Sequence, residues 1–145
     1  MHHRRNRARP PLRAALLLIL AIPACGGPSM TPRADRARGA LEAALTAWRE
    51  GKPPGNIAGT DPPVQAIDNE WTNGRKLAAF EVLRELPSES DRRFAVKLTH
   101  RAPDAAVEVA YVVLGSNPIA VIREEDFART LNMDNNPVPK KKRTR

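Results

Sequence analysis

The sequence predicts an α+β domain in which one N-terminal helix packs on an antiparallel sheet of four or five strands. Apolar residues recur at helical spacing near the start of the domain, over residues 34–50. They alternate at strand spacing further along, over residues 93–101 and 106–114. The chain has 145 residues, which suffices for one modest domain, and we place that domain at residues 34–131.

The helix over residues 34–50 is the clearest element. Thr31 can cap its amino end, and Gly51 can end it. Its apolar face is mostly alanine, which lets a sheet approach closely, with one large side chain as an anchor. That face comprises Ala37, Leu41, Ala44, Leu45 and Trp48.

The next two segments predict a loop and a short strand. Residues 51–63 contain too many Pro and Gly for a helix or an interior strand, so we expect a connecting loop. Residues 64–71 alternate and predict a strand. The Thr-Asn-Gly sequence at 72–74 predicts a turn that closes a hairpin with the segment after it.

Residues 75–86 fit two kinds of element. Leu77, Phe80, Leu83 and Leu86 would share a helix face, and periodicity alone does not decide between helix and strand. We predict a strand because a turn precedes this segment and clear strands follow it.

The following segments predict an antiparallel meander. Strands over 93–101, 106–114 and 119–123 are joined by two tight turns. Both faces of the strand over 106–114 are apolar, so we expect it to be central and covered on both sides. A short helix is predicted over 124–131.

The amino terminus predicts export. Residues 1–24 carry five arginines and no acid, and the run over 14–22 is continuously apolar. Nine residues of helix span about 14 Å, too little for a membrane of about 30 Å. This pattern is typical of a secretory signal peptide. The Arg4-Arg5 pair also allows a twin-arginine signal, although the apolar pair that should follow is absent.

Ile22-Pro23-Ala24-Cys25 resembles the lipobox of bacterial lipoproteins, with an aliphatic residue at minus three and a small residue at minus one. Pro23 departs from the usual residue at minus two. The resemblance implies that Cys25, the one cysteine of the chain, receives a diacylglyceryl group and that residues 25–33 tether the domain to a membrane. The alternative is an ordinary signal peptide cut near Ala24. The lipoprotein resemblance also implies outer-membrane rather than inner-membrane display within the cell envelope, because Gly26 stands where some lipoproteins carry an Asp that retains them at the inner membrane.

The net charge of +8 lies at the two ends of the chain. Without residues 1–24 the net charge is +3, and residues 25–139 carry 14 basic against 16 acidic groups. This balance argues against specific nucleic-acid binding. Residues 132–145 are predicted to form a disordered tail that is solvated or contacts anionic lipid or an envelope polymer. Its basic residues are Lys140, Lys141, Lys142, Arg143 and Arg145.

The order of elements, one helix before four or five strands, resembles the cystatin-like fold and its larger relative, the SnoaL-like or nuclear-transport-factor-two-like cone. The segments 109–113 and 119–123 are similar to those of small exported bacterial proteins. The resemblance implies a curved antiparallel sheet that wraps one long N-terminal helix. The larger cone begins with more helix than this chain has, which favours the smaller fold.

Five residues are candidates for a pocket in such a cone: Asp68, Glu70, Trp71, His100 and Tyr111. A SnoaL-like hydrolase or isomerase would use a histidine paired with an acid for proton transfer. The spacing does not favour that pair, and a histidine at the end of a strand is expected to be solvated. The acids before the turn fit an exposed strand face equally well.

The sequence predicts neither a metal site nor a cofactor. One cysteine excludes internal disulfides and cysteine-rich zinc sites. The acids Glu124, Glu125 and Asp126 are explained by the dipole of the helix that they begin.

We therefore expect a membrane-anchored lipoprotein of the cell envelope whose small domain binds without catalysis. The alternatives are a SnoaL-like small-molecule-binding protein or enzyme, and a purely structural envelope protein docked by its tail.

Overall fold

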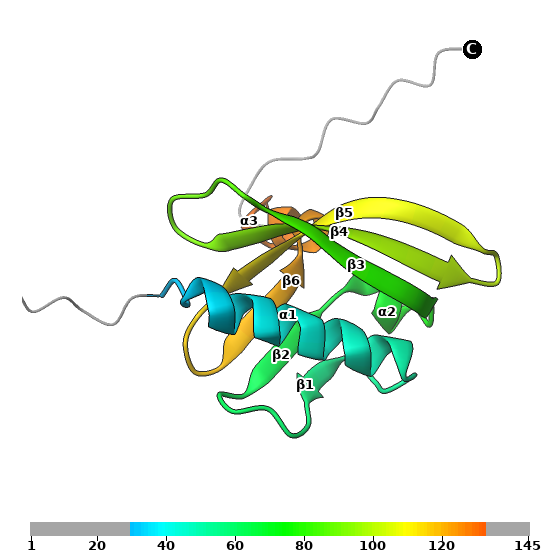
Figure 1. The fold of residues 1–145 in the computed structure, drawn as a ribbon, viewed down its shortest axis with the longest axis horizontal. Helices are drawn as coiled ribbons and strands as arrows, with labels where there is room; N and C mark the ends of the chain where they lie inside the picture. The colour runs from blue at the N-terminus through cyan, green and yellow to red at the C-terminus, as the bar shows by residue number, and fades with distance from the viewer. Residues whose placement is uncertain (1–29, 133–145) are drawn as a thin grey trace, which may run out of the picture.

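The computed structural model describes residues 30–132 (Figure 1). The predicted signal peptide, the predicted lipidation site Cys25 and the basic residues of the tail lie outside the described residues. The elements are α1 (Ala34–Arg49), β1 (Gly55–Ile57), β2 (Val64–Ile67), α2 (Asn69–Thr72), β3 (Lys76–Leu86), β4 (Arg92–Arg101), β5 (Ala105–Leu114), β6 (Ile119–Arg123) and α3 (Glu124–Asn132).

Helix α1 ends within one residue of its predicted bound, but it is not the long N-terminal helix that we expected. It has 16 residues and begins at residue 34. Gly51, at a φ of 76°, stops it because this left-handed conformation cannot continue a helix. The amino end has no side-chain cap. Thr31, the predicted cap, donates its hydroxyl hydrogen bond to the Ser90 carbonyl at 2.8 Å.

The sheet has six strands and is mixed, so the prediction of four or five antiparallel strands was too simple. The order is β1-β2-β6-β5-β4-β3. Strands β3 to β6 form an antiparallel meander, which confirms the pairing predicted for the last three. Strand β2 pairs parallel with β6, with Val64 opposite Ile119. The predicted hairpin after β2 was therefore wrong, since β2 pairs with β1 and β6 and not with β3.

The sequence did not predict two elements next to β2, namely strand β1 and helix α2. Strand β1 lies within the predicted loop, where the three residues 55–57 are free of proline and pair antiparallel with β2. Helix α2 replaces the end of the predicted strand. Its single turn begins after Asp68, whose carboxylate accepts a hydrogen bond from the Trp71 amide at 3.0 Å. An aspartate in this position stabilises a helix start by satisfying an unpaired amide.

Residues 75–86 fitted both a helix and a strand, and the structure has strand β3 there, as predicted. The pairing of β3 also explains why its sequence has a helix-like spacing. The pairing with β4 shifts between Leu77 and Ala79 and again between Val82 and Arg84. Each bulge adds a residue on one strand, so side chains three apart can face the same way. Leu77 and Phe80 therefore both contact the core, which gives the sequence its helix-like spacing.

The core lies between α1 and one face of the sheet (Figure 1). Its side chains come from α1, Trp71 of α2 and strands β2 to β6. Helix α3 contacts β5 and β6 behind the sheet in this view. Val112 is fully buried and points away from the core, since side chains alternate along a strand. The carboxyl half of β5 is thus covered on both sides as predicted, whereas residues 105–108 are exposed.

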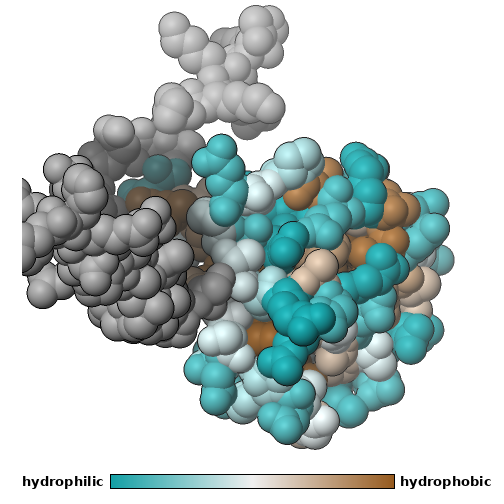
Figure 2. Space-filling view, turned by 60° about the vertical axis from the view of Figure 1, so that its left-hand side comes forward, coloured by the Kyte–Doolittle hydropathy of each residue, from teal (hydrophilic) through white to brown (hydrophobic). Residues whose placement is uncertain are grey.

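The face of the molecule seen in Figure 2 is mostly hydrophilic. In Figure 2, the apolar patches on the visible face are small and separated by polar residues. The large apolar side chains that residues 30–132 expose come from separate elements, a pattern that does not define an apolar interface. They are Met30, Ile67, Leu83, Val107 and Leu131. Over the same residues, no helix is both long and apolar enough to cross a membrane.

Candidate functional site

Asp68 is the centre of a buried polar cluster. It lies just before α2 and is 2% exposed. Its Oδ2 accepts a hydrogen bond from the Tyr111 hydroxyl of β5 at 2.5 Å and lies 3.7 Å from Nη1 of Arg123, the last residue of β6. Its Oδ1 accepts the Trp71 amide hydrogen bond. Buried charges need such partners because an unpaired one is costly.

The cluster continues into α3. Asp126 accepts hydrogen bonds from the Asn69 amide at 2.8 Å and from Asn69 Nδ2 at 2.6 Å. Arg123 Nε lies 3.2 Å from Glu125 Oε2. Burial raises the pKa of Tyr111 well above its usual value, and the Asp68 charge raises it further, so the phenol stays protonated. The cluster therefore joins α2, β5, β6 and α3 as a structural unit.

Beside this cluster, two tryptophans and a histidine pack together. The rings of Trp48 and Trp71 stack with centroids 5.5 Å apart, and the His100 ring lies 5.6 Å from Trp48. Trp48 Nε1 donates to the Arg75 carbonyl at 2.7 Å, and Trp71 Nε1 donates to the Lys52 carbonyl at 2.9 Å. Both indole hydrogens are thus satisfied.

The expectation of a solvated His100 was wrong. The residue is 4% exposed, because its position on β4 faces α1 and Trp48. Burial lowers its pKa, and the positive charge of Arg75 lowers it further, so the imidazole is neutral at pH 7. Its Nδ1 is buried without a hydrogen-bond partner among the described residues.

The structure brings four of the five predicted pocket residues together but in the interior. Asp68, Trp71, His100 and Tyr111 are buried, whereas Glu70 is exposed on α2. Five hollows of residues 30–132 are lined by residues other than Asp68, His100 and Tyr111. Asp68 contacts Trp71 and Tyr111, whereas His100 packs on Trp48, and these side chains do not line any of the five hollows together.

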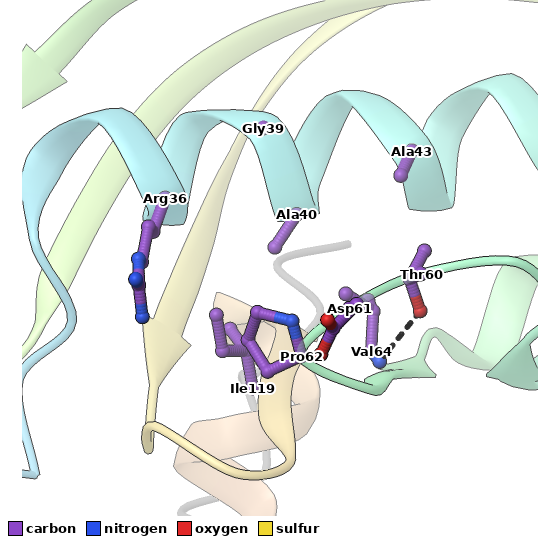
Figure 3. A pocket seen from close by; sticks show the side chains of 9 residues that line it. All are labelled: Arg36, Gly39, Ala40, Ala43, Thr60, Asp61, Pro62, Val64 and Ile119. Carbon is purple, nitrogen blue, oxygen red and sulfur yellow. Dashed lines mark hydrogen bonds between the residues drawn. The ribbon is translucent and has the colours of Figure 1, made fainter.

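A cleft of about 320 Å³ lies between α1 and the loop that joins β1 to β2 (Figure 3). Ala40 and Ala43 point from α1 toward this loop, and Arg36 extends from α1 at one side of it. The loop is held by a hydrogen bond from the Val64 amide to Thr60 Oγ1 at 3.0 Å. The lining residues are Arg36, Gly39, Ala40, Ala43, Thr60, Asp61, Pro62, Val64 and Ile119.

The chemistry of this cleft is amphipathic. Small side chains of α1 and the apolar Val64 and Ile119 form its walls, with charged groups at Arg36 and Asp61. The ion pairs among residues 30–132 include none made by Arg36. A smaller hollow of about 190 Å³ shares Arg36 and Ile119 with the cleft. We call these two adjoining hollows the groove, because both are lined by Arg36 and Ile119.

Sequence reasoning missed this groove. The signal that could have found it is the set of small residues at 39, 40 and 43, which share one face of α1 opposite a proline-rich loop. A Cβ built on Gly39 has no heavy atom within 4 Å, which shows how open this wall is.

The acids at the start of α3 serve separate partners. Glu124 contacts Arg93 at 2.6 Å, Glu125 contacts Arg123, and Asp126 contacts Asn69. Over residues 30–132, His, Cys, Asp and Glu side chains do not gather in a group that could hold a metal ion.

A scan against protein-family models, a search of curated proteins and a search of solved structures each gave no match for this chain. The function is therefore inferred from the residues and their geometry.

Proposed function

We propose that this chain is an exported lipoprotein, anchored to a bacterial membrane through Cys25, whose domain binds a small amphipathic ligand without transforming it. The cleft between α1 and the β1–β2 loop carries the proposal. Its volume of about 320 Å³ lies at the lower end of the range for small-molecule sites. The buried acids and the histidine do not line the cleft, so the cleft offers binding groups but no histidine–acid pair for proton transfer.

The cleft favours a ligand with an apolar body and one negatively charged group. The apolar body would lie along Ala40, Ala43 and Ile119. Arg36, which is exposed and lacks an acidic partner among the described residues, would take the charged group. A guanidinium binds carboxylate, sulfonate and phosphate oxygens through two parallel hydrogen bonds.

The point where the chain enters the domain supports a membrane-facing groove. The Met30 carbonyl accepts a hydrogen bond from the Gly115 amide at 2.6 Å, and Arg92 Nε donates to the Pro32 carbonyl at 3.2 Å. The smaller hollow is lined by Thr31 and Pro32 and lies beside this point. Met30 lies five positions after Cys25, and five residue steps can span at most about 17 Å. A lipid on Cys25 would therefore keep the groove near the membrane surface.

Binding of anilinonaphthalene sulfonate, an aromatic anion whose fluorescence rises in apolar surroundings, tests the cleft. Gly39→Leu should abolish the increase, because the new side chain enters open space and fills the cleft. Ala34→Leu is the matched control, since Ala34 is exposed on α1 but does not line the cleft. Arg36→Gln should weaken binding several-fold. Equal binding by wild type and Gly39→Leu would overturn the proposal.

A second candidate function is the SnoaL-like enzyme. One observation favours it, namely the contact of the Tyr111 hydroxyl with Asp68 beside a neutral, buried His100. Turnover of small esters, lactones or steroid-like ketones, lost in both His100→Ala and Asp68→Asn, would replace the binding proposal. Under the binding proposal, none of these compounds is consumed by wild-type protein.

A further inference from the structure

Another hollow lies at the opposite end of α1 from Arg36, where α2 meets β3 and the β4–β5 turn. It has a volume of about 260 Å³ and is lined by Glu70, Asn73, Gly74, Arg75, Lys76, Arg101 and Ala102. It shares no residue with the cleft at Arg36. Three of its seven lining residues are cations and one is an acid.

The sheet brings two of these cations together. Lys76 and Arg101 are direct partners in the antiparallel pairing of β3 with β4. Like charges placed opposite each other in a sheet destabilise it unless a counter-charge is present. The ion pairs among residues 30–132 include none made by Arg75, Lys76 or Arg101. Within the described residues, Lys76 and Arg101 therefore have no carboxylate as a salt-bridge partner.

Arg75 adds a third cation, and two hydrogen bonds hold its backbone in place. Its amide donates to the Glu70 carbonyl at 2.9 Å, and its carbonyl accepts the Trp48 indole hydrogen bond. Its Nε is buried and has no hydrogen-bond partner among the described residues. The part of the Arg75 side chain that lines the hollow has no carboxylate partner among the described residues, so its charge is available to an oxyanion there.

We propose that Arg75, Lys76 and Arg101 bind the phosphate group of an anionic ligand. The three cations and Glu70 give the hollow a net charge of +2. A phosphate monoester carries about −1.5 to −2 at pH 7 and presents three acceptor oxygens, which matches the net charge of the hollow and gives each of the three cationic side chains an oxygen to bind. This site is separate from the cleft at Arg36 and does not depend on the function proposed for it.

The test is titration of the purified full chain with inorganic phosphate, in parallel with vesicles of phosphatidic acid in phosphatidylcholine. Lys76→Gln and Arg101→Gln should each weaken binding about tenfold, the loss expected for a charge-assisted contact. Folding is not compromised, because each change removes a like-charge contact. Lys97→Gln is the matched control: it removes the same charge from the exposed face of β4, outside the hollow.

Glu70→Gln supplies a change of opposite sign. Removing this exposed carboxylate from the hollow should strengthen phosphate binding several-fold, which a misfolded protein cannot do. Binding of soluble phosphate with this pattern of variants identifies a soluble phosphate ligand. The same pattern with vesicles alone identifies a lipid headgroup. Absence of binding in both arms, or an equal loss in Lys97→Gln and Arg101→Gln, overturns the proposal.

Discussion

The Tyr111 hydroxyl donates a hydrogen bond of 2.5 Å to Oδ2 of Asp68, which lies 43 positions earlier in the chain. Both residues are 2% exposed. Asp68 also begins α2 and lies within ion-pair distance of Arg123. This contact connects the central strand β5 to the segment between β2 and α2, so it fixes the position of Trp71 beneath α1.

Tyr111→Phe should lower the free energy of unfolding by about 1–3 kcal/mol. The variant removes only the hydroxyl and leaves a buried carboxylate with one donor fewer. Denaturant unfolding of Tyr111→Phe, Asp68→Asn and the double variant measures the coupling between the two side chains. We expect the double variant to lose less than the two single losses added together. Strict additivity would show that the hydroxyl and the carboxylate do not interact.

The free energy of unfolding should rise with pH between the lowered pKa of His100 in the folded protein and its ordinary value of 6.5. Its pKa is lowered in the folded protein from the ordinary 6.5, so the unfolded chain binds more protons below that pH. The free energy of unfolding should therefore fall as pH drops from about 6.5 and level off below the folded pKa. His100→Phe, which keeps a ring beside Trp48, should remove this slope. If the slope is unchanged in His100→Phe, a titrating group other than His100 causes it.

Two glycine substitutions should have opposite effects on stability. Gly39→Ala should raise the free energy of unfolding by about 0.5–1 kcal/mol, because Gly39 lies inside α1 and its Cβ meets open space. Gly115→Ala should lower it, since Gly115 has a φ of 81° and its Cβ would lie 2.7 Å from the Pro118 carbonyl oxygen. Thermal unfolding of both variants checks the pair. A loss of stability in Gly39→Ala would show that the cleft wall is closed.

Acid stability should depend on Arg93. Hydrogen bonding from Arg93 holds the pKa of Asp91 below its ordinary 3.8, and Ser88 assists. A lowered carboxyl pKa stabilises the fold above the unfolded value and loses this effect as pH falls through the folded pKa. Arg93→Gln should therefore cost about 1–3 kcal/mol at pH 7 and much less near pH 2.

Arg84→Gln provides the comparison for Arg93, because Arg84 makes an exposed ion pair with Glu108. Exposed pairs contribute little, so the loss should be under about 1 kcal/mol. Equal losses in the two variants, measured by urea unfolding at both pH values, would contradict a special role for the Asp91 contact.

Local sequence patterns predicted most of the elements but not how the strands pair. The alternation of residues 106–114 located β5, and the small apolar face of residues 37–48 located α1. The parallel pairing of β2 with β6 joins Val64 to Ile119, and nothing local to either segment specifies a partner so distant. Strand β1 is three residues long and paired on one side, too short to give a period.

The candidate site was less predictable for a related reason. The sequence singled out Asp68 and Tyr111, and the structure brings them into contact, but their burial depends on the packing of α2 and α3. His100 was expected in solvent because the end of a strand is usually exposed, whereas the Trp48 ring covers it. The cleft depends on the small side chains at 39 and 43, which are noticed only once the opposing loop is in place.

Anchoring of this domain through Cys25 is tested most directly by the mass of the protein isolated from bacterial membranes, beside a Cys25→Ala variant. We expect the wild-type mass to equal residues 25–145 plus a diacylglyceryl group, and this addition to be absent from the variant. An unmodified wild-type mass with residues 1–24 still attached would contradict the lipoprotein proposal and remove the reason to place the groove at a membrane.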